Sequence, residues 1–222
     1  MPRESRTHGN GSHKSHNGRK SHDAPMSRTG SRTRRMVDVQ WLGNFLSEML
    51  AVEKGGVQLY DKALKDLEHS ELEEKLNDFL RQTHRHVELC TAMLEAVGGY
   101  PDYKSPGAQA AEHKANGLIS AQVPAEMADL NNIENLVLAE TKDHWNWEML
   151  ASIASKIGDP ELKRKVTKAV TEVRRQEKTH LDWNERTLSK LAMESALHPP
   201  ASGEMSESAP EDRGEGMYSK EE

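Results

Sequence analysis

The sequence predicts an all-α protein whose central part is an antiparallel four-helix bundle, built from two helical hairpins joined by a long crossover. The composition favours helix, because aromatic residues make up 5% of the chain and β-branched residues are sparse beside Ala, Leu, Glu and Lys. In four stretches the apolar residues recur with the period of an amphipathic helix. The connections between these stretches are short, long and short, and a long middle connection is what joins two hairpins side by side.

Each stretch is bounded by residues that end or begin helices. Gly98-Gly99 and Pro101 end the second stretch. Gly158-Asp159-Pro160 separates the third from the fourth, with Gly ending one helix and Asp and Pro opening the next. The four predicted helices cover residues 39–68, 71–97, 130–157 and 160–193.

The segment 98–130 breaks the helical pattern with several prolines and glycines. It is too long for a tight turn, so we expect a crossover that includes a short helix around residues 108–116. The segment thereby connects the first predicted hairpin to the second.

The two ends of the chain differ from the middle in charge. Residues 1–36 carry nine Lys/Arg against two acidic residues, or +7, and residues 196–222 carry seven Asp/Glu against two basic residues, or −5. Neither has hydrophobic periodicity, so we expect both to be disordered, on either side of a bundle domain at 37–195. The basic segment is interpreted as a nucleic-acid-binding arm, as a metal-capturing segment through its histidines, or as a solvated tail or upstream extension.

Several classes of protein are excluded by composition. The single cysteine, Cys90, allows no intramolecular disulfide and no cysteine-based zinc or iron–sulfur site. No run reaches the roughly 18 apolar residues of a membrane span, and the basic N-terminal segment is not followed by the apolar core of a secretory signal. We therefore expect a soluble cytoplasmic protein without a membrane partner.

Polar residues interrupt the apolar stripes on all four predicted helices. A lone glutamate or histidine at such a place is more often a boundary residue than a ligand. Buried carboxylates cost several kcal/mol unless they are paired or bind a metal, however, and inward-pointing groups on all four helices favour the metal. Carboxylates with imidazoles suit iron or manganese. The candidate ligands are Glu53, His86, Glu140, Glu177 and His180.

These motifs resemble the ferritin-like superfamily, in the bacterioferritin and rubrerythrin style, over residues 37–193. The similar segments are Glu53 to Tyr60 (EKGGVQLY), His86 through Gly98-Gly99-Tyr100-Pro101, Glu140, and Glu177 to Leu181 (EKTHL). The resemblance implies a di-iron or di-manganese site, in which Glu53 and Glu140 are terminal ligands and Glu177 bridges. It also implies that the second helix carries a glutamate three residues before its histidine.

The sequence has Thr83 at that position, so one bridging carboxylate is missing. The site then holds two metals less tightly, holds one metal on the Glu140/Glu177/His180 side, or is a remnant. Three functions follow from these options. The first is a metal-dependent protein with ferroxidase or peroxide-detoxifying activity, assembled as a homo-oligomer. The second is a non-enzymatic, stress-associated bundle that binds DNA through residues 1–36. In the third, a buried polar network only sets helix register.

Overall fold

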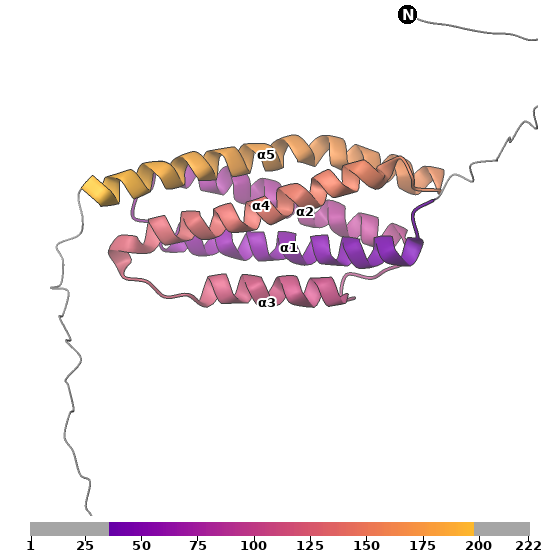
Figure 1. The fold of residues 1–222 in the computed structure, drawn as a ribbon, viewed down its shortest axis with the longest axis horizontal. Helices are drawn as coiled ribbons and strands as arrows, with labels where there is room; N and C mark the ends of the chain where they lie inside the picture. Colours follow the sequence, from indigo (N-terminus) through magenta and orange to yellow (C-terminus); the bar gives the residue numbers. More distant parts are fainter. Residues whose placement is uncertain (1–35, 198–222) are drawn as a thin grey trace, which may run out of the picture. The chain divides into compact units, whose positions relative to one another are not determined.

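In the computed structural model, residues 36–197 are described, and they form helices without any strand (Figure 1). The prediction of an all-α protein is confirmed. The expectations for residues 1–35 and 198–222 lie outside the described residues. The helices are α1 (Val39–Lys65), α2 (Glu73–Ala96), α3 (Pro106–Ser120), α4 (Ala128–Ala154) and α5 (Pro160–Leu197), with short 3₁₀ turns η1 (Ser70–Leu72) and η2 (Ala125–Met127).

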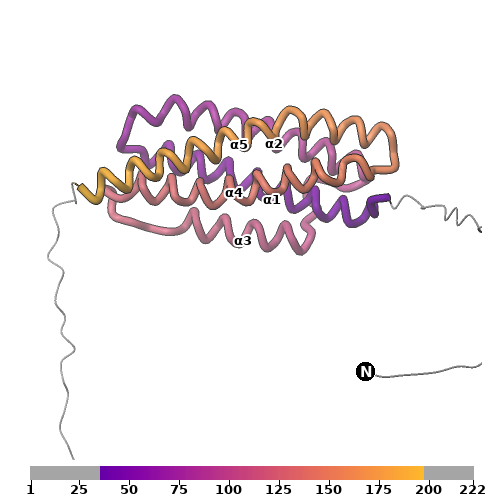
Figure 2. The backbone as a smooth tube through the Cα atoms, turned by 45° about the horizontal axis from the view of Figure 1, so that its top comes forward, coloured from indigo at the N-terminus to yellow at the C-terminus, as the bar shows by residue number. Residues whose placement is uncertain are grey.

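Four long helices surround a common interior. Helices α1 and α2 form one hairpin and α4 and α5 the other, and the hairpins meet through α1 against α4 and α2 against α5. Figure 2 shows these helices side by side from a second direction. Because Tyr60 of α1 bonds Glu140 of α4, whereas the earlier Glu53 bonds the later Trp147, the two helices run antiparallel.

Helix α3 is longer than the short helix expected around 108–116, and it runs along the outer side of α1 (Figures 1 and 2). Ser105 caps it, since its hydroxyl accepts from the Ala108 N–H, and Pro106 opens the first turn. A methyl group at Gly55 would lie 2.9 Å from the Ala115 Cβ. Close approach of α3 therefore explains a mid-helix glycine that would otherwise cost about 1 kcal/mol.

The apolar core is divided into two clusters along the bundle. One cluster combines the first half of α1 with the second half of α2, the end of α4 and the start of α5, and includes Leu46, Met93 and Leu150. The other combines the opposite halves and includes Phe79 and Leu136. Buried polar residues occupy the layer between them.

The end of the last helix differs from the prediction. Helix α5 continues to Leu197, past the residue 193 expected for its end, so residues 196 and 197 belong to the helix. Among residues 36–197, no helix is both long and apolar enough to cross a membrane.

Candidate metal centre

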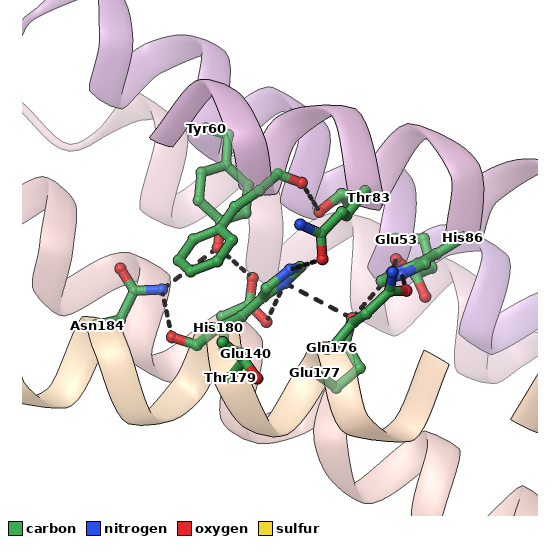
Figure 3. Close-up of polar contacts among 12 residues, drawn as sticks. Glu53, Tyr60, Thr83, His86, Glu140, Gln176, Glu177, Thr179, His180 and Asn184 are labelled. Carbon is green, nitrogen blue, oxygen red and sulfur yellow. Dashed lines mark hydrogen bonds and ion pairs between the residues drawn. The ribbon is translucent and has the colours of Figure 1, made fainter. Parts of the chain in front are cut away.

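All five predicted ligands meet in the middle layer of the bundle (Figure 3). Each long helix contributes at least one, and α5 contributes two because Glu177 and His180 are three residues apart on one helical face. None of the five side chains is more than 5% exposed. Their burial in one layer is the feature that the interrupted stripes predicted.

The ligands form two groups that share one carboxylate. Glu53, His86 and Glu177 make the first group, and Glu140, Glu177 and His180 make the second. Within each group one possible ligand atom per residue lies within 4.8 Å of the others. Such buried carboxylate and imidazole groups could hold a metal ion, and Glu177 is placed to serve both groups.

Two glutamines hold the imidazoles in a reciprocal arrangement. His86 Nε2 lies 2.9 Å from the Gln176 Oε1 of α5, and His180 Nε2 lies 3.2 Å from the Gln82 Oε1 of α2. An amide oxygen only accepts, so each Nε2 carries the proton. In the neutral ring the Nδ1 lone pair is therefore left facing the carboxylates, as an outer partner of a metal-bound histidine would leave it.

Two aromatic donors hold the terminal carboxylates in the same reciprocal way. The Tyr60 hydroxyl of α1 donates to Glu140 Oε1 of α4 at 2.7 Å, and Trp147 Nε1 of α4 donates to Glu53 Oε1 of α1 at 2.8 Å. Each donor stands seven residues after the glutamate of its own helix. Asn184 supports Tyr60 with a further bond of 3.3 Å to its hydroxyl oxygen.

Five buried polar atoms of these residues have no hydrogen-bond partner among residues 36–197. They are Glu53 Oε2, Glu140 Oε2, Glu177 Oε2, His86 Nδ1 and His180 Nδ1. His86 Nδ1 lies 2.8 Å from Glu177 Oε1, yet without hydrogen-bond geometry. Buried atoms of this kind cost about 1–3 kcal/mol each when unsatisfied. A shared cation would satisfy all of them, so the residues fit a metal.

The pKa values of the site residues are shifted by their burial and by the charged groups packed next to them. Burial opposes the charged form of His86, but contacts with Glu177 and Glu53 outweigh it and raise the pKa of His86 to about 11. Burial, and next the charge of Glu140, raise the pKa of Glu177 well above its usual range. Burial would raise the pKa of Glu140 too, but the charge of His180 and hydrogen bonds lower it. Protons thus balance the cluster in the metal-free protein, and a cation would replace them.

Position 83 is where the resemblance to ferritin-like proteins would place a further glutamate. Thr83 is buried beside the cluster, and its hydroxyl donates to the Phe79 carbonyl of its own helix at 3.0 Å. Its methyl group lies 3.4 Å from where a Cβ on Gly56 would be. In place of the carboxylate that the resemblance leads one to expect, the chain has a small side chain that lies against α1.

Four residues of the site were not identified from the sequence. Gln82, Gln176 and Trp147 hold ligands, and Asp143, one turn after Glu140, is buried beside them. An internal repeat would have revealed three of them. Gln and His are four residues apart on both α2 and α5, and Glu and an aromatic donor are seven apart on both α1 and α4.

Replacing Gln176 with leucine tests whether the glutamines orient the ligands. The variant keeps the volume but removes the acceptor for His86 Nε2, so we expect the affinity of the metal at the Glu53/His86/Glu177 group to fall about 10- to 100-fold. Equilibrium Mn(II) titration measures this. Gln176→Glu, which retains an acceptor, should keep the affinity, and a Leu variant with the wild-type affinity would show that the bond is only structural.

Comparison of the chain with protein-family models, curated proteins and solved structures finds no match.

Proposed function

We propose that this chain is a ferritin-like metal-binding protein that holds two iron or manganese ions between its helices and acts as a ferroxidase or peroxide-detoxifying protein. The observation that carries the proposal is the pair of buried ligand groups joined by Glu177. The two-hairpin arrangement with a long crossover supports the ferritin-like assignment.

Each side chain of the site would have its own role in metal binding. Glu53 and Glu140 would be terminal ligands, each fixed by an aromatic N–H or O–H donor from the opposite hairpin. His86 and His180 would each offer Nδ1, and Glu177 would bridge. Bound iron would supply one-electron redox chemistry toward oxygen or peroxide. The surrounding apolar clusters, including the Phe79 ring 4.2 Å from the His180 ring, would keep water from the ligands.

The test is elemental analysis of the purified protein, followed by anaerobic loading with Fe(II) and exposure to oxygen or peroxide. We expect about two metal ions per chain and a rise in ferric absorbance after exposure. Protein that remains metal-free after loading would contradict the proposal. Protein that binds iron but leaves it ferrous under both oxidants would limit the proposal to metal binding.

The homo-oligomeric state remains an expectation. The alternative in which residues 1–36 bind nucleic acid concerns a segment almost wholly outside the described residues, and no feature of residues 36–197 favours it.

A further inference from the structure

Asp143 is an acidic residue of the middle layer to which the proposed ligand set gives no role. It lies on α4 one turn after Glu140 and is 6% exposed. Its Oδ1 has no hydrogen-bond partner among residues 36–197. An isolated buried carboxylate is costly, so this acid needs a compensating group.

The neighbours of Asp143 place it on one side of the cluster. Burial, then the charges of Glu177 and Glu53, raise the pKa of Asp143, with a contact to the Glu53 carboxyl adding to the effect. Cys90 lies on α2 one turn after His86, and besides burial the acids that raise its pKa are Glu53, Asp143 and Glu177. The geometry agrees with this placement. Asp143 stands one turn before Trp147, whose indole donates to Glu53 and whose ring centroid lies 6.1 Å from that of His86. Asp143 therefore lies on the Glu53/His86 side of the cluster, next to the ligand group whose atoms lie within 4.8 Å of one another and which does not itself include Asp143.

The internal repeat shows which positions of the two hairpins correspond. Three residues after the glutamate, α1 has Gly56 and α4 has Asp143. Directly after the glutamine, α2 has Thr83 and α5 has Glu177. The first hairpin thus lacks a carboxylate at position 83, and the second hairpin carries an extra one at position 143.

We propose that Asp143 is the fourth carboxylate of the metal centre and completes the Glu53/His86/Glu177 group in place of the carboxylate missing at Thr83. This inference rests on the proposed function. Three carboxylates would leave two divalent cations with one excess positive charge in a buried site, whereas four carboxylates neutralise them. Charge balance is strongly favoured where the charges are removed from water.

The alternative is that Asp143 is a structural acid that only bonds Glu53. Asp143→Asn distinguishes the two, because asparagine keeps the shape and the bonding capacity but loses the charge. The probe is Mn(II) alone, titrated under equilibrium conditions and followed by its electron paramagnetic resonance signal, so that no turnover is needed.

We expect wild-type protein to bind two Mn(II) ions, and Asp143→Asn to bind one with unchanged affinity and the second at least about tenfold more weakly. Loss of an outer partner alone costs about 10- to 100-fold, and loss of a direct ligand should cost no less. Asp143→Ala, whose helix propensity is higher, should behave the same way and guards against a folding defect peculiar to asparagine.

A second substitution that restores Mn(II) binding is a stricter test than the single variants. In Asp143→Asn/Thr83→Glu, the carboxylate returns at the repeat position of Glu177, and we expect the second Mn(II) ion to bind again. A structural role for Asp143 would not predict this rescue. Two equally tight ions in Asp143→Asn would overturn the inference and leave the proposed function intact, whereas wild-type protein that binds no Mn(II) and no iron would overturn both.

Discussion

Replacing Glu177 with glutamine is expected to remove metal from both halves of the site at once. The residue belongs to both ligand groups, so one uncharged amide weakens each of them. Since loss of an outer partner already costs about 10- to 100-fold, we expect each affinity to fall by at least about 100-fold. Metal content of the purified variant and its Fe(II) oxidation rate measure the loss.

The metal-free Glu177→Gln protein should stay folded. Burial already raises the pKa of Glu177 well above its usual range, so its neutral form is favoured and glutamine resembles that form. The matched control is Glu185→Gln, the same exchange at an exposed position of α5, which should keep wild-type metal content. The double variant Glu177→Ala/His180→Ala should lose both metal retention and ferroxidase activity. Wild-type metal content in the glutamine variant would rule out a bridging role.

Removing the metal is expected to lower the thermal stability of the protein substantially. A ligand that binds only the folded state at a free concentration of 100 times its Kd stabilises by about 2.7 kcal/mol. For a domain of this size that corresponds to roughly 5–10 °C in Tm. Thermal unfolding of Mn(II)-loaded protein with and without a strong chelator measures the shift.

The same experiment separates a metal centre from a polar network that only sets helix register. A register network is complete within the protein, so a chelator would leave its Tm unchanged. Glu177→Gln supplies the internal control, because a variant without metal should show no chelator-dependent shift. A large shift in that variant would indicate that the chelator acts elsewhere on the chain.

Much of the helical architecture was predictable because its signals are local. The spans of the four long helices follow from apolar periodicity and from caps such as Gly158-Asp159-Pro160, which involve neighbouring residues only. Helix α3 was underestimated for the converse reason. Its start at Pro106 is capped locally by Ser105, among prolines and glycines that the sequence pattern reads as loop, whereas its packing along α1 is a contact between residues far apart in the chain.

The candidate site also has residues that the sequence identified and one that it did not. The five candidate ligands were identifiable because each interrupts an apolar stripe, and all five lie together in the structure. Asp143 lies on the same buried face of α4, between Glu140 and Trp147, but it was not singled out. The inner face of α4 is itself partly polar, with buried Asn132, Asn135 and Asn146, so one more polar residue on it does not stand out from an apolar stripe.

By itself, the sequence determined the helical class and the residue types of a candidate metal centre, since both depend on spacing within single helices. Only the tertiary structure decided how these residues are held. The bonds that orient the ligands join residues 80 to 98 positions apart, as between Tyr60 and Glu140 or His180 and Gln82. Such pairs meet only when two hairpins pack antiparallel, and the same packing buries Asp143 beside them.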